Sequence, residues 1–287
     1  GQMKTPNSFD EITSGRFTST YERAAFSDAF EFDRRVGVQA HRSGERYTFA
    51  AGVFGENLES DAVDGGMALA ARGTYAVPFG EDGLVHLGAS ARYREQGDDS
   101  GLIRYRQRPY AHIPGRVIST GAIADSDTFY GAEIAMVVSR FWAAAEYGVT
   151  DADCTACAGG DPTLDGYYLE AGMILGGERT YKGGRFDRPK VDAPLGEGGN
   201  GAWSFVARLD SIDQRDGGVD GGELDTLVLG ADWWPTAYSR LGINAFWNDV
   251  SYGASTSGLD PAFAQQVVAG TESDDVSGVT VRLQFDF

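Results

Sequence analysis

The chain has 287 residues, 40 of them Gly, and carries 24 basic against 42 acidic side chains, for a net charge of −18. The hydrophobic share of 42% is too high for a disordered chain, and no run of about twenty apolar residues marks a membrane-spanning helix. The negative charge argues against nucleic-acid binding, which needs clustered basic residues.

The chain opens on Gly-Gln-Met-Lys-Thr, which reads as the tail of a strand, and residues 7–32 follow as an irregular stretch. From there on, apolar and polar residues alternate with the period of a half-buried β-strand. The pattern repeats in about twelve segments of roughly ten residues, which predicts an all-β protein. The apolar positions include Val36 and Val38, Phe49 and Val53, Leu69 and Tyr75, Leu87 and Tyr93, Tyr147 and Val149, Leu169 and Met173, Leu241 and Ile243, and Val281 and Phe285.

The connections between these segments differ in length. Short turns are predicted near Gly44, Gly80, Ser139 and Pro235, and long polar loops at residues 97–102, 151–163, 176–200, 213–222 and 253–275. Short turns on one rim and long loops on the other are typical of an outer-membrane β-barrel. A soluble propeller or solenoid would need a repeat of about 20 to 50 residues, which is not found. We therefore predict a single domain, residues 1–287, that forms a transmembrane antiparallel β-barrel.

The strand face opposite the apolar positions is predicted to line a lumen. Nine arginines lie on this face against six acids, Glu133, Glu146, Glu170, Asp210, Asp225 and Asp286. Arg104, Arg106 and Arg108 form the densest group, because strand alternation would aim all three guanidiniums into the lumen about 7 Å apart. Anion pores are built from rings of basic side chains. For any single arginine, the alternative is an ion pair that braces the wall.

Several segments carry a resemblance to a known family. They are residues 11–39, Gly73-Thr-Tyr-Ala-Val-Pro-Phe, Arg104-Tyr-Arg-Gln-Arg-Pro, and the closing Val281-Arg-Leu-Gln-Phe-Asp-Phe. Over essentially the whole chain, the sequence is similar to the phosphate- and polyphosphate-selective porins of the O and P type. The resemblance implies a sixteen-stranded, trimeric barrel in a Gram-negative outer membrane. It also implies small anionic solutes, lipid and lipopolysaccharide as partners. Since about thirteen strands are visible, roughly three N-terminal strands are expected to be missing.

The resemblance further implies that residues 7–32 form an infolded loop that constricts the pore. The predicted pore-lining, anion-binding residues are Arg16, Arg23, Arg34, Arg35, Arg72, Arg92, Arg94, Arg104, Arg106 and Arg108. The sequence departs from the family's lysine-rich phosphate site, since no Lys lies between Pro6 and Tyr181 and six acids crowd residues 10–33. We predict a passive diffusion channel with an arginine-lined lumen that prefers phosphate- or polyphosphate-like anions.

Other candidate chemistry is sparse. Cys154 and Cys157 lack a second Cys pair or a His at zinc-ligand spacing, which predicts a local disulfide or two inert thiols. The acidic glycine loop at residues 216–225 lacks the spacing of an EF-hand, and we interpret it as a solvated hairpin. No catalytic motif is present, so we predict no enzyme activity, cofactor or metal. The alternative function is a structural barrel with a plugged pore that anchors envelope partners.

Overall fold

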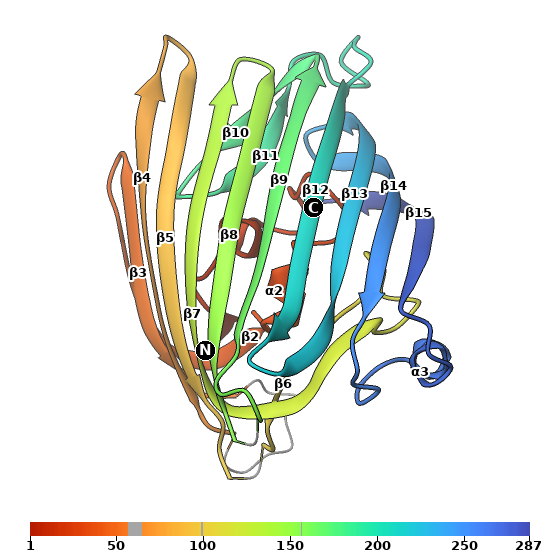
Figure 1. Ribbon diagram of the computed structural model, residues 1–287. Coiled ribbons are helices and arrows are strands. Elements are labelled where there is room, and N and C mark those ends of the chain that lie inside the picture. The colour runs from red at the N-terminus through yellow and green to blue at the C-terminus, as the bar shows by residue number, and fades with distance from the viewer. Residues whose placement is uncertain (57–64, 99, 156) are drawn as a thin grey trace.

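The computed structural model describes residues 1–56, 65–98, 100–155 and 157–287, and one antiparallel sheet dominates it (Figure 1). This main sheet has thirteen strands. They are β1 (Gln2–Lys4), β2 (Arg34–Ser43), β3 (Tyr47–Phe54), β4 (Met67–Phe79), β5 (Gly83–Glu95), β6 (Ile103–Gln107), β7 (Ile118–Val138), β8 (Phe141–Cys154), β9 (Thr163–Leu175), β12 (Ala202–Asp216), β13 (Val219–Thr236), β14 (Ser239–Tyr252) and β15 (Ser273–Phe285). The predicted all-β, antiparallel fold is confirmed.

The long strands turn their apolar side chains outward. Phe49, Leu169 and Val281 are 52%, 52% and 67% exposed, whereas Thr48 and Glu170, which neighbour the first two in sequence, are buried on the inner side. Successive side chains of a strand point to opposite faces, so the alternating sequence produces an apolar outer face and a polar inner one. This arrangement is the inverse of a soluble protein and is that of an outer-membrane barrel wall.

The main sheet curves around a central space without closing. Its order runs from β1 at one edge to β15 at the other, and within the described residues neither edge strand has a partner on its free side. Figure 1 shows the strands wrapped around the N-terminal segment. The predicted closure of the barrel and its sixteen strands therefore stay predictions.

The two rims of the sheet carry different connections. The short-turn rim carries the turns at residues 80–82, 139–140 and 237–238, and the opposite, long-loop rim carries residues 253–272 with α3 (Pro261–Val268). The long loop predicted at residues 213–222 is wrong, because β12 and β13 stay paired up to a two-residue turn of glycines. Residues 99 and 156, which belong to two other predicted loops, lie outside the described residues.

The outer loop predicted at residues 176–200 is also wrong. This segment leaves β9 at the short-turn rim, where the Ile174 N–H donates to the Arg140 carbonyl. It then forms a separate hairpin of β10 (Gly177–Tyr181) and β11 (Phe186–Val191). The hairpin folds into the lumen, because Phe186 packs edge-on against Phe9 of the N-terminal segment with 4.7 Å between ring centroids.

Residues 7–32 lie inside the sheet and contain two short helices, α1 (Phe9–Ile12) and α2 (Ala25–Ala29) (Figure 1). Phe26, Phe30 and Phe32 pack around Phe129 of β7, with ring centroids 6.4, 6.0 and 4.7 Å away. The main apolar core therefore lies in the lumen, between the wall and this internal segment.

The helices of the structure are few and short. Among the described residues, none is both long enough and apolar enough to cross a membrane.

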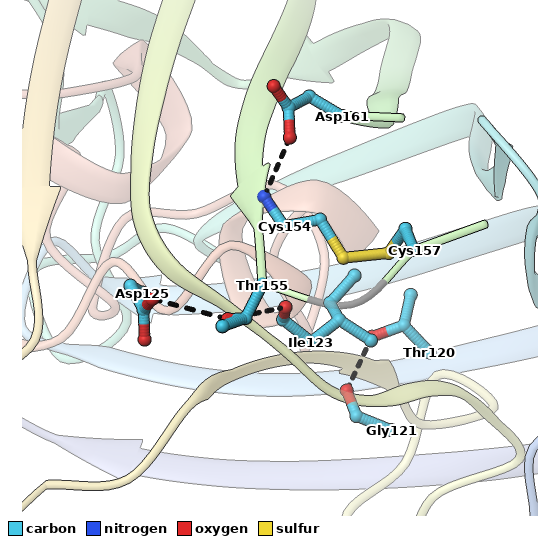
Figure 2. The surroundings of a disulfide bond; sticks show 8 residues. All are labelled: Thr120, Gly121, Ile123, Asp125, Cys154, Thr155, Cys157 and Asp161. Atoms are coloured by element: carbon cyan, nitrogen blue, oxygen red, sulfur yellow. Dashed lines mark hydrogen bonds between the residues drawn. A yellow bond between two sulfur atoms is a disulfide. The ribbon is translucent and has the colours of Figure 1, made fainter. Parts of the chain in front are cut away.

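A disulfide joins Cys154 and Cys157 at the end of β8 (Figure 2). The Cys154 N–H donates to the Asp161 carboxylate over 2.9 Å, and the Thr155 hydroxyl lies 3.2 Å from the Asp125 carboxylate. The disulfide is one of the two outcomes that the sequence predicts, and these contacts lie beside it at the long-loop rim.

We predict that removing this disulfide costs little stability. The bond closes a loop of only a few residues, for which the chain-entropy relation gives about 2 kcal/mol. Urea unfolding of a double Cys154→Ser/Cys157→Ser variant should therefore show a free energy of unfolding lower by no more than about 2 kcal/mol. Failure of the variant to fold would contradict the prediction, and wild-type protein under reducing conditions serves as the control.

Candidate functional site in the lumen

A single wall carboxylate holds the start of the internal segment. Glu146 of β8 accepts hydrogen bonds from the N–H groups of Phe9 and Asp10, each over 2.7 Å, and from the Ser8 hydroxyl over 3.1 Å. A buried N–H without a partner costs about 1–3 kcal/mol. Glu146 therefore satisfies backbone groups that water cannot reach.

Other wall strands and the β10–β11 hairpin hold the rest of the segment in the same way. Side chains of β9, β10, β12 and β14 each bind a backbone or hydroxyl group of residues 17–25. These contacts join Glu170 to the Ser19 hydroxyl (2.8 Å), Asp210 to Ala25 N–H (3.0 Å), Asn244 to Tyr21 N–H (2.6 Å), Arg179 to the Phe17 carbonyl (2.5 Å) and Arg240 to the Thr18 carbonyl (2.9 Å). The internal segment is thus fixed to the wall from several sides.

Arg208 of β12 is the central cation of this network. It is fully buried, and its guanidinium lies 3.2 Å from Asp10, 3.2 Å from Asp210 and 3.5 Å from Glu170. The strand register brings Arg208 directly opposite Glu170. Burial alone would raise the pKa of Asp10 in the internal segment, but Arg208 and Arg23 outweigh it and hold this pKa below its usual value.

The predicted arginines of β4 and β5 are buried and paired with acids. Arg72 reaches Glu133 of β7 over 2.5 Å. Gly88 of the intervening strand makes this possible, since a Cβ there would lie 2.1 Å from the Glu133 carboxylate. Arg92 and Arg94 both bind Asp127 of β7. These contacts favour the bracing role.

The four predicted pore-lining arginines in or next to the internal segment are dispersed. Arg16 and Arg34 are exposed. Arg23 forms an ion pair with Glu11 over 3.2 Å, and Arg35 with Glu56 over 3.0 Å. The structure does not bring these four arginines together into one site.

Arg104, Arg106 and Arg108 share one face of β6 and are half-buried, whereas Ile103, Tyr105 and Gln107 on the other face are buried. Tyr105 packs edge-on against Phe30 of the internal segment. Arg108 lies 3.1 Å from Asp28. Neither Arg104 nor Arg106 forms an ion pair with any described residue. The three guanidiniums therefore form a row on one face, as the alternation predicts. The opposite face, with Tyr105, is the one that packs against the internal segment, and Arg104 lies beside Gly258 of the long-loop rim. The prediction that strand alternation aims all three arginines into the lumen is therefore wrong.

Sequence reasoning missed Arg116, which extends this row. Its guanidinium binds both oxygens of Asp28, beside Arg108. Burial and the neighbouring Arg108 and Arg106 lower the pKa of Arg116, although Asp28 opposes the change. Arg116 lies outside the strands, in the connection between β6 and β7, so no periodic pattern could orient it.

The predicted count of charged side chains on the inner face of the strands also needs correction. Asp225 is exposed on the outer face, while Asp127 and Asp232, not counted among the luminal acids, are buried inside. Near strand ends the outer face leaves the apolar band and becomes polar, so a polar residue there does not mark the lumen. Arg240 binds Asp232 over 2.8 Å. The buried arginines are thus largely matched by acids.

Two cavities flank the α1 segment. The first, about 540 Å³ and nearer the long-loop rim, is lined by five carboxylates against three guanidiniums. The carboxylates are those of Glu11, Glu22, Asp28, Asp33 and Asp210, and the guanidiniums those of Arg23, Arg34 and Arg108. The second, about 370 Å³ and nearer the short-turn rim, is lined by Lys4, Arg72, Lys182 and Arg185 with one acid, Asp187. The two cavities therefore differ in the sign of their charge.

Comparison with known proteins agrees with this architecture. An uncharacterized protein of Caulobacter vibrioides is 36% identical over 295 residues, which cover 98% of this chain and 57% of that protein. Porin O of Pseudomonas aeruginosa is 24% identical over 297 residues, which cover 96% of this chain and 66% of Porin O. The chain thus spans less than two thirds of the length of these relatives.

The family model described as phosphate-selective porin O and P matches residues 1–287. The match extends over the wall strands, the internal segment and the hairpin alike. The chain therefore belongs to the phosphate-selective porin O and P family.

Proposed function

We propose that this protein forms a passive diffusion channel for small solutes that prefers anions. The arginine row on β6 is the observation that supports the proposal most directly. Arg104, Arg106 and Arg108 lie half-exposed on one face, and two of them are free of ion pairs within the described residues. Guanidiniums stay charged when partly desolvated and bind oxyanions through a fixed fork of donors. A permeating anion could pass from one to the next.

We also propose that residues 1–287 form one barrel domain in the outer membrane of a Gram-negative bacterium, with residues 7–32 constricting the pore. The apolar outer face supports contact with lipid, and barrels of this class turn their short connections to the periplasm. A homotrimer that also contacts lipopolysaccharide is part of the proposal. Porins are channels, so no enzyme activity is proposed.

The anion preference is proposed to be mild. The acid-rich first cavity lies on the same side of the lumen as the arginine row, and Asp28 pairs with both Arg108 and Arg116. These carboxylates offset part of the positive potential that an anion would meet.

We predict that neutralising the arginine row abolishes the anion preference. Reversal potentials of the purified protein in planar bilayers under a KCl gradient should show chloride more permeant than potassium. In a double Arg104→Gln/Arg106→Gln variant, the reversal potential should move toward the cation side, because two positive charges that we propose to lie along the path of the permeating ion are lost. Arg46→Gln, a change of an exposed arginine in the turn between β2 and β3, serves as the matched control. A cation preference of the wild type, or equal shifts in both variants, would contradict the proposal.

We also predict that acidification strengthens the anion preference. Burial, helped by nearby Asp28, raises the pKa of Glu22, and burial with nearby Glu31 raises that of Asp33. Both groups line the first cavity. A raised pKa means that these carboxylates become neutral at a higher pH than ordinary ones, so the cavity loses negative charge early.

The measurement is the ratio of chloride to potassium permeability between pH 7 and about pH 5. The ratio should rise as the pH falls, and it should rise less in a Glu22→Gln variant, which has already lost one of the charges. A ratio that is constant or falls over this range would show that these acids do not act on the permeating ions.

The second candidate function is a structural barrel with a plugged pore. It is favoured by the dense anchoring of residues 8–25 to the wall. Absence of stepwise conductance in bilayers, together with a stable envelope partner bound at the long-loop rim, would support it over the channel.

A further inference from the structure

We propose that the first cavity binds a small organic dication, a diamine such as putrescine, through its carboxylates and its buried oxygen acceptors. The inference goes beyond the proposed channel and does not depend on its anion preference. The lining comes mainly from the internal segment, from the end of β6 with the connection that follows it, and from β12 and β13. The volume of about 540 Å³ is within the range of cavities that hold small-molecule ligands.

The charge of the lining is the first argument. Five carboxylates against three guanidiniums leave a net charge of −2 when the one lining histidine is neutral. Arg23 and Arg108 already pair with two of the lining acids, Glu11 over 3.2 Å and Asp28 over 3.1 Å. These guanidiniums therefore do not neutralise the remaining carboxylates, and the excess charge matches that of a dication.

Two carboxylates of the lining have no Arg or Lys partner. Asp33 forms no ion pair with any described residue, and the Glu22 carboxylate lies 3.6 Å from the largely exposed ring of His112. Burial contributes most to the raised pKa of both acids, because their charged forms are poorly solvated there. A bound ammonium group would supply the missing positive charge. Arg34, the third lining guanidinium, also lacks an ion pair within the described chain and would oppose a bound cation.

Buried oxygen acceptors are the second argument, and they are independent of the charge. Gln107 and Ser27 both line the cavity and are 6% and 4% exposed. Neither the Gln107 amide oxygen nor the Ser27 hydroxyl has a hydrogen-bond partner among the described residues, and one carboxylate oxygen of Glu22 is buried in the same state. A buried acceptor without a partner is costly. An ammonium group, which has three donors and no acceptor, suits such a lining.

The spread of these groups favours an extended organic cation over a metal ion. In the part of the chain that the structure describes, no three carboxylate, imidazole or thiol groups converge so as to hold a metal. Tyr21, which is 44% exposed, and Phe32 add ring surface to the lining. Such surface packs against methylene groups, and the face of a Tyr ring attracts an ammonium group. A short methylene chain with an ammonium group at each end uses both the rings and the separated acceptors.

The test is the dissociation constant of putrescine, measured by isothermal titration calorimetry on the folded full chain in detergent at low ionic strength. Glu22→Gln keeps the shape of the side chain and removes its charge. It should raise the dissociation constant about tenfold, as expected for one lost hydrogen bond to a charged group. Glu45→Gln, a change of an exposed acid in the turn between β2 and β3, is the matched control and should leave the constant unchanged.

A gain of affinity gives a second test that misfolding cannot mimic. Arg34→Gln removes the unpaired guanidinium of the lining and should tighten putrescine binding, whereas Arg46→Gln outside the cavity should not. A pair of buried glutamines tests the neutral acceptors. Gln107→Met should weaken binding, whereas Gln214→Met should not, because Gln214 is also buried without a hydrogen-bond partner among the described residues but does not line the cavity.

Four outcomes would each overturn the site: no putrescine binding to the wild type, equal effects of Glu22→Gln and Glu45→Gln, no gain in Arg34→Gln, or equal effects of the two glutamine changes. Binding of Mg²⁺ with the same affinity and the same loss in Glu22→Gln would overturn the assignment to a diamine. Reversal potentials keep the two proposals apart. A wild type that prefers cations yet binds putrescine as described would disprove the anion channel and support the site.

Discussion

The structure depends on one constraint, which is that a polypeptide segment buried inside a membrane barrel must find partners for its backbone groups. The helices within residues 7–32 are too short to pair most of the segment's backbone N–H and C=O groups, since α1 and α2 have only four and five residues. The wall supplies the partners through charged side chains, and Glu146 alone serves two N–H groups and one hydroxyl. Many of the luminal charges therefore exist to hold the internal segment.

This constraint changes the meaning of an arginine-rich lumen. Arg72, Arg92, Arg94, Arg208 and Arg240 are buried and paired with acids. A buried ion pair is costly to break, so such arginines stabilise the fold more than they act on permeating ions. Cations that remain half-exposed or unpaired can act on a solute. Such cations lie at β6 and at the hairpin tip, and the half-buried Arg282 of β15 is another.

The sequence alone predicts the wall well, because strand alternation has a period of two and reports directly which side chains face lipid. It also places Arg104, Arg106 and Arg108 on one face. It does not predict the partners of Arg92 and Arg94, since Asp127 lies some thirty residues away and pairing depends on strand register. Lys182 and Arg116 were missed because they lie in connections, where no periodicity orients a side chain.

The central claim, that wall carboxylates fix the internal segment, is tested most directly by amide hydrogen exchange of the folded protein in detergent or nanodiscs. The account predicts that peptides covering Phe9, Asp10 and Ala25 are protected nearly as strongly as the strands, and that Glu146→Ala makes Phe9 and Asp10 exchange much faster. Exchange of these amides in the wild type as fast as that of the exposed turn at residues 80–82 would contradict it.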